Sequence, residues 1–164
     1  SPAGRVHCTL EDWSRFVSAH LLGGAGAHDL LQARTFQFLH QPPPGDGNSY
    51  AAGWVVVERP WAPGPILTHS GSNTMWFCTT WVAPGSNLAV LVACNQGGEQ
   101  AVSACDTAAS LCIVRELRRR ASAYDRRNWD ATPDRTWLGS DFWANRLQHK
   151  SFNVSTHFFP KLVV

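Results

Sequence analysis

The sequence predicts an α+β domain in which an antiparallel sheet is flanked by helices. Apolar residues recur at helical spacing in residues 8–24 and 98–120, whereas residues 50–95 change to the period of strands. Short turns rich in proline and glycine separate the strand-like runs, which favours antiparallel pairing of consecutive strands. A chain of 164 residues is one domain's worth by length and can bury a large core.

Two helices are predicted before residue 42. Thr9 followed three residues later by Asp12 is an N-cap signature, and Gly23-Gly24 ends the run that follows. Residues 28–41 repeat the helical pattern and stop before three prolines. The first helix is expected to bury a stripe made of Leu10, Trp13, Phe16, Val17 and Leu21.

Four strands are predicted between residues 50 and 95. The segment 84–87, PGSN, is a hairpin turn between the last two of them. If this hairpin pairs Ala83 with Leu88, Cys78 and Cys94 point to opposite faces of the sheet, which argues against a disulfide between them. The strands are expected at residues 50–60, 66–71, 74–83 and 88–95.

A third helix is predicted over residues 98–120. Its expected buried stripe consists of Val102, Cys105, Ala109, Cys112 and Ile113.

Composition excludes several classes of function. Five cysteines without CxxC spacing do not favour a zinc site, and we expect free thiols and no metal or other cofactor. No apolar run approaches the roughly 20 residues that a membrane-spanning helix needs. Histidines 7, 20, 28 and 40 lack the spacing of metal ligands and are expected at the surface or at helix caps.

The C-terminal residues differ in character from the rest. Residues 1–114 carry a net charge of −3, whereas residues 115–164 carry +5 and mix arginine with tryptophan without a sustained period. Residues 118–164 are therefore expected to form an irregular or disordered extension. Aromatic residues interleaved with arginine could stack on single-stranded nucleic acid, but acids are interspersed, so no nucleic-acid partner is expected. A shifted reading frame is another explanation for this segment.

The triplet His69-Ser70-Gly71 is the main candidate for a functional site. It stands at the end of a predicted strand and is followed by small polar residues and then by an alternating apolar run. The residues alone allow two interpretations: a functional edge of the sheet, or a polar turn between two strands. The segments around the triplet favour the first.

Four segments occur in a particular order along residues 2–114. They are SPAGRVHCTLEDWSRFV, with its Thr-x-x-Asp helix start; YAAGWVVVE; HSGSNTMW; and WVAPGSNLAVLVACNQGG, which ends a strand pair with asparagine. In this order and spacing the chain resembles the C-terminal part of the serine β-lactamase and penicillin-binding-protein family, in the branch called β-lactamase-related serine hydrolases. HSG resembles the family's Lys-Thr-Gly motif in its His-Ser/Thr-Gly form. The resemblance implies that residues 1–117 are part of a β-lactamase/transpeptidase-like fold.

The resemblance also implies roles for four site residues in acyl transfer. The N–H of Ser72 would be one of the two oxyanion donors, and Gly71 would leave room for substrate along the strand edge. His69 would replace the family's lysine and donate to a substrate carboxylate or tune the protons of the site. Ser70 would hydrogen-bond the substrate or the base. The substrate would be a small-molecule or peptide ester, amide or β-lactam-like acyl compound.

The chain departs from the family in two motifs. No serine has lysine three residues later, as the nucleophile motif Ser-x-x-Lys requires, and Tyr-x-Asn is also missing. In the family both motifs precede the region matched here, so the chain is expected to be a C-terminal fragment that is inactive alone. The alternative is a non-catalytic binding domain that keeps the fold. Family members are often exported, which favours the periplasm or secretion by analogy.

Overall fold

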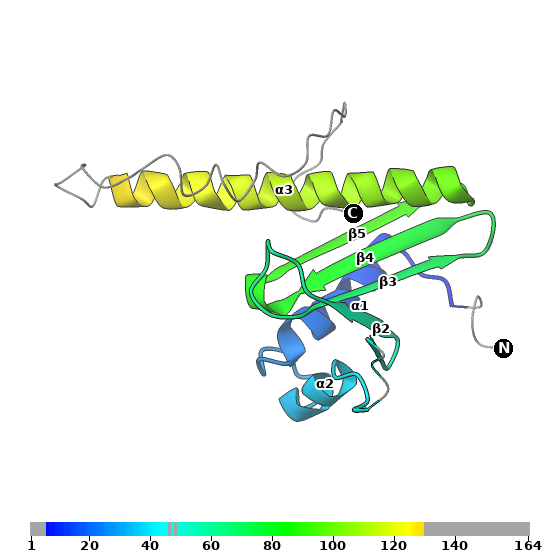
Figure 1. Ribbon diagram of the computed structural model, residues 1–164, viewed down its shortest axis with the longest axis horizontal. Helices are drawn as coiled ribbons and strands as arrows, with labels where there is room; N and C mark the ends of the chain where they lie inside the picture. The colour runs from blue at the N-terminus through cyan, green and yellow to red at the C-terminus, as the bar shows by residue number, and fades with distance from the viewer. Residues whose placement is uncertain (1–5, 46, 48, 130–164) are drawn as a thin grey trace. The chain divides into compact units, whose positions relative to one another are not determined.

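The computed structural model describes residues 6–45, 47 and 49–129, and the prediction of an α+β fold is confirmed. The strands form one antiparallel sheet in the order β1-β2-β3-β4-β5, and α1 packs against one of its faces (Figure 1). The elements are α1 (Leu10–Gly23), α2 (Ala33–Leu39), β1 (Tyr50–Ala51), β2 (Trp54–Val57), β3 (Ile66–Ser72), β4 (Phe77–Ala83), the 3₁₀ turn η1 (Pro84–Ser86), β5 (Leu88–Cys94) and α3 (Glu99–Trp129).

Helix α1 begins where the sequence predicts. The Thr9 hydroxyl accepts a hydrogen bond from the Asp12 N–H at 3.1 Å, which satisfies one of the free donors of the first turn. The buried face differs from the predicted stripe. Leu10 and Phe16 are exposed, and the helix buries Val17, Ala19, His20 and Gly23. Gly23 lets α1 approach α2 closely, because a methyl group at this position would overlap the ring of Phe36.

Helix α2 is shorter than predicted. It begins at Ala33 rather than near residue 28, because the backbone before it is held in a different local structure. The Leu30 N–H donates to the ring Nδ1 of His28 at 3.2 Å, a local bond that competes with helix formation.

The first predicted strand is instead a hairpin. Ala52 and Gly53 both have positive φ, 42° and 100°, so the chain reverses and pairs Ala51 with Trp54. Two positive φ angles in succession are the signature of a tight two-residue hairpin turn. The Ala-Gly dipeptide is a weaker turn signal than Asn-Gly, and its meaning was missed within an otherwise continuous strand pattern.

The register of the longer strands agrees with the sequence. Ala83 pairs with Leu88, as predicted, and Cys78 pairs with Ala93. Cys94 therefore points to the face opposite Cys78. All five cysteines are free thiols.

The two faces of the sheet have separate cores. On one face Val17 of α1 packs with Trp54, Leu67, Val82 and Leu91. On the other face Phe77 packs with Ala101 and Cys105 of α3. Because alternate residues of a strand share a face, His69 lies on the same face as Leu67, which is the α1 face.

The buried residues in the first half of α3 are Ala101, Cys105, Ala109 and Ile113, whereas Val102 is exposed.

The described residues fall into two units, one ending at Ile113 and one beginning at Val114. In the second unit, Glu116 accepts hydrogen bonds from Arg119 and Arg120. The hydrogen bond from Arg119 has the largest effect on the pKa of Glu116, and together with the bond from Arg120 it lowers this pKa to about 2. The helix continues past Arg120 to Trp129, so the first part of the predicted irregular extension is helical. Residues 130–164 lie outside the described part of the chain, and none of its helices is long and apolar enough to cross a bilayer.

Candidate functional site

Residues 69–72 lie within strand β3, and the turn reading of the triplet is wrong. Each of the four has a partner on β4, and the turn to β4 comes only after Ser72. The pairs are His69 with Thr80, Ser70 with Thr79, Gly71 with Cys78 and Ser72 with Phe77.

This segment extends beyond the neighbouring strand on its other side. Strand β2 pairs with β3 only at Ile66, Leu67 and Thr68. Residues 69–72 are all exposed. Along residues 69–72, β3 is therefore an edge of the sheet, although it lies third in the strand order. An edge presents backbone N–H and C=O groups that can pair with another chain or a ligand.

The Ser72 N–H points to the open side of this edge. The Asn73 N–H donates to the carbonyl oxygen of Trp76, across the turn, at 3.3 Å. Backbone groups of successive residues alternate in direction along an antiparallel strand. Because Asn73 turns its N–H toward the β4 side, Ser72 turns its own N–H away from β4. This is the direction that the oxyanion role requires.

The turn after Ser72 fixes that orientation with several hydrogen bonds. The Ser72 hydroxyl accepts from the Thr74 N–H at 3.0 Å and donates to the Trp76 carbonyl at 2.8 Å. The Asn73 side-chain oxygen accepts from the backbone N–H of Trp76 at 2.8 Å. The amide at the edge is therefore held by a preorganised turn.

The structure separates the side chains of His69 and Ser70. The Ser70 hydroxyl hydrogen-bonds that of Thr79 at 2.8 Å, on the face opposite His69. The His69 ring lies on the α1 face, with its centroid 6.2 Å from that of Tyr50. His69 and the backbone edge therefore share one site, whereas the Ser70 hydroxyl does not face His69.

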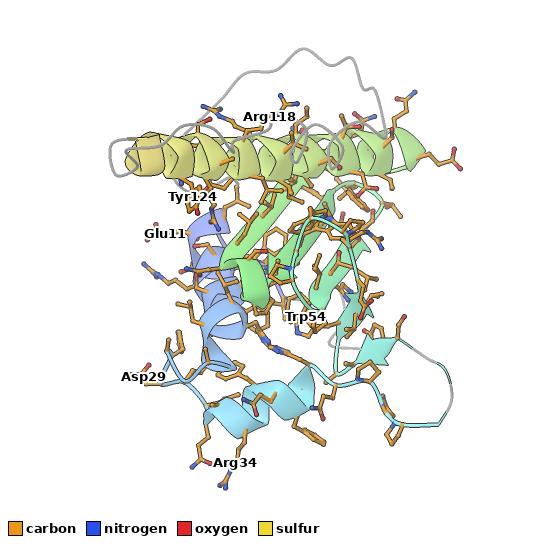
Figure 2. All side chains as sticks on the ribbon, turned by 60° about the vertical axis from the view of Figure 1, so that its left-hand side comes forward. Glu11, Asp29, Arg34, Trp54, Arg118 and Tyr124 are labelled. Atoms are coloured by element: carbon orange, nitrogen blue, oxygen red, sulfur yellow. The ribbon has the colours of Figure 1, made fainter. Side chains whose placement is uncertain are left out.

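A cavity of about 250 Å³, half open to solvent, lies beside His69, between the sheet and α1. We call it the aromatic cavity. It is lined by Trp13, Phe16, His20, Ala52, Gly53, Trp54, His69 and Thr80. The hairpin turn at residues 52–53 thus helps to form the cavity, and Trp54, labelled in Figure 2, follows directly after it.

His20 is a cavity residue that the sequence analysis missed. It was expected at the surface or at a cap, but it is only 8% exposed. Its Nδ1 lies 2.9 Å from Nε2 of His40, and its ring centroid lies 5.0 Å from that of Trp54. Its position three residues after Val17 and four after Phe16 on α1 could have indicated burial.

Burial changes the titration of this histidine pair. Desolvation lowers the pKa of His20, and desolvation together with the neighbouring His20 lowers the pKa of His40 from 6.5 to about 4. A bond between two neutral imidazoles needs one donor and one acceptor nitrogen, which protonation of both rings would remove. The pair is therefore neutral at pH 7.

We expect the free energy of unfolding to fall as the pH drops from about 6.5 toward 4. The unfolded chain binds protons at these rings at higher pH than the folded chain, so the stabilisation is complete above the unfolded pKa and is lost below it. The loss should be about 1 kcal/mol by pH 5, because His40 stays partly solvated. Urea unfolding of H40Q should show a flatter pH profile, with H7Q as the control. If H40Q showed the same pH dependence as the wild type, the histidine pair would not be the cause of the loss of stability.

The comparisons with family models, curated proteins and solved structures find no match to this chain. Among the described residues, no three His, Cys, Asp or Glu side chains come together as a metal site. The open edge of β3 and the aromatic cavity next to it are therefore the features that bear on function.

Proposed function

We propose that residues 69–72 are the substrate-side strand edge of a serine hydrolase that transfers acyl groups. The single observation that carries this proposal is the edge itself: β3 continues past β2, and the Ser72 N–H is directed away from β4. An acyl substrate that lies along this edge can place its carbonyl oxygen at this N–H. The substrate class is an ester, an amide or a β-lactam-like compound.

In this chemistry the chain supplies only part of the catalytic groups. Attack of a serine on the acyl carbon produces a tetrahedral oxyanion, and fixed N–H donors stabilise the negative charge as it develops. Ser72 supplies one such donor, and His69 stands beside the reacting group as a hydrogen-bonding partner. The proposal places the nucleophile and its base in a Ser-x-x-Lys motif, which does not occur within these 164 residues.

Labelling with a fluorophosphonate tests this proposal. The 164-residue chain alone should show no labelled serine by mass spectrometry. The product of the complete reading frame should be labelled at one serine outside these residues, within a Ser-x-x-Lys motif. Heat-denatured protein is the control for nonspecific labelling. Stoichiometric labelling of a serine in this chain, or no labelling of the longer product, would contradict the proposal.

The second candidate is a non-catalytic binding domain with the same fold. The observation that favours it is the aromatic cavity, which is formed within this chain and needs no nucleophile to bind a ligand. Ligand binding combined with an unlabelled longer product would favour this candidate over the hydrolase.

A further inference from the structure

We infer that the aromatic cavity binds an uncharged group with a single aromatic ring and one polar atom next to the ring. This inference deepens the proposed function, on which it rests for its role: the group would be the acyl side of the substrate. The binding itself requires only this chain. Size, shape, polar atoms and charge of the cavity each support the inference.

The volume limits the ligand to about one ring. The cavity measures about 250 Å³, whereas pockets for drug-sized ligands span roughly 300–1,000 Å³. A benzene ring with a small substituent fits this space, and a fused multi-ring compound would extend out of it.

The walls are flat and apolar. The rings of Phe16 and Trp54 lie nearly parallel, at 13°, with centroids 6.4 Å apart. Trp54 is 5% exposed and therefore fixed, whereas Phe16 is 51% exposed. A large aromatic side chain that stays half in solvent beside a cavity is suited to cover a bound ring. Such ring pairs favour offset-stacked or edge-to-face contacts.

His20 presents one ring nitrogen to the cavity. Nδ1 of His20 is engaged with His40, and no hydrogen bond joins its Nε2 to any described residue. Every fully enclosed side-chain nitrogen or oxygen of the described residues has a partner, so Nε2 is not fully enclosed. Because this ring lines the cavity and is more than nine-tenths buried, we place Nε2 at the cavity surface.

Thr80 adds a second polar group. Its hydroxyl donates to the carbonyl oxygen of Val90 at 3.1 Å, so its oxygen can still accept a hydrogen bond from a ligand. The Thr80 side chain is 2% exposed and lines the same cavity. A ligand with both a donor and an acceptor, such as a primary amide, matches His20 and Thr80.

Charge discriminates against ionised ligands. None of the lining residues is Lys, Arg, Asp or Glu. Two are histidines: His20 is buried, and His69, for which the resemblance implies a bond to a substrate carboxylate, is exposed to solvent. An ion that enters an apolar site without a counter-charge loses its hydration and gains no ion pair in return. A carboxylate or an ammonium group on the same ring should therefore bind more weakly than the neutral amide.

Benzamide and benzoate provide the matched test, because they share the ring and differ in charge. Titration of the ¹⁵N-labelled chain at pH 7.5, followed by NMR, should shift the indole N–H signals of Trp13 and Trp54 with benzamide. Binding of benzoate should be at least tenfold weaker. The variant F16A should weaken benzamide binding about threefold or more. F38A removes a phenylalanine that is exposed on α2 and does not line the cavity, so it should bind as the wild type does.

The outcomes separate this inference from the proposed function. No shift with benzamide, benzoate binding as tight as benzamide, or equal effects of F16A and F38A would each overturn the inference. Phe16 is 51% and Phe38 74% exposed, so folded variants are expected, and the ¹⁵N spectrum of each free variant separates a loss of fold from a loss of binding. Fluorophosphonate labelling does not depend on this cavity. Labelling without benzamide binding therefore overturns the ligand assignment alone, and binding without labelling overturns only the hydrolase.

Discussion

Replacing Ser72 by proline is expected to lower the turnover of an activated ester about 10²–10³-fold. The measurement applies to the product of the complete reading frame, in which the proposal places the nucleophile. Proline removes the N–H of residue 72, and this N–H is directed away from β4, so the β3–β4 ladder keeps its hydrogen bonds. Gly71, which precedes it, lies in a strand, and extended backbone is what proline favours in the residue before it.

The variant S72A is the matched control. It keeps the backbone N–H but loses the hydroxyl that accepts from the Thr74 N–H and donates to the Trp76 carbonyl. We expect S72A to lose about 1 kcal/mol of stability per hydrogen bond and to retain most of its turnover. Equal losses of turnover in S72P and S72A would assign the effect to the turn rather than to the amide. Full turnover in S72P would contradict the proposed oxyanion role of Ser72.

The fold class could be predicted because the apolar residues follow the spacing of helices and strands, and because local signals mark several element ends. Thr9 and Asp12 mark the start of α1 by a local hydrogen bond that depends only on neighbouring residues. The PGSN turn sets the register of β4 and β5, and the pairing of Ala83 with Leu88 follows from it. The break between β1 and β2 was missed because the pattern of apolar and β-branched residues continues through Ala52 and Gly53. Only the positive φ angles show that the chain turns there.

The candidate site was predictable only in part. The sequence singles out residues 69–72, and the structure puts them in one strand with an open edge. It does not bring the side chains of His69 and Ser70 together, because neighbouring residues of a strand point to opposite faces. A sequence motif names residue types, but the face that each one occupies depends on its phase in the strand.

The aromatic cavity could not be derived from sequence order. Its lining comes from α1, the β1–β2 turn, β2, β3 and β4, which span residues 13–80 of the chain. The sequence predicts His20 at the surface or at a helix cap, because the histidines lack the spacing of metal ligands. Its burial depends on His40, twenty residues later, which satisfies one of its ring nitrogens. The spacing of His20 from Val17 on α1 indicates its face of the helix, but the partner on the other side of the loop does not follow from that spacing.

Gly97 connects the stability of the fold to the geometry of the site. It lies between β5 and α3, and a methyl group at this position would meet the backbone carbonyl of Thr74. Thr74 belongs to the turn that holds Ser72, and its own φ of 73° leaves that turn little freedom to adjust. Backbone atoms cannot rotate out of the way as the end of a flexible side chain can.

The variant G97A is therefore expected to lose about 1–3 kcal/mol of stability, the usual cost of overpacking a close contact. The shifted turn should also move the Ser72 amide and reduce ester turnover in the complete reading-frame product. G24A is the matched control: its new methyl group would meet only the Gln37 side chain at 3.9 Å, and its φ is −64°. G24A should change stability by no more than about 0.5 kcal/mol. Urea unfolding measures the stability of both variants. Equal midpoints for G97A and G24A would show that the Gly97–Thr74 contact places no constraint on the turn.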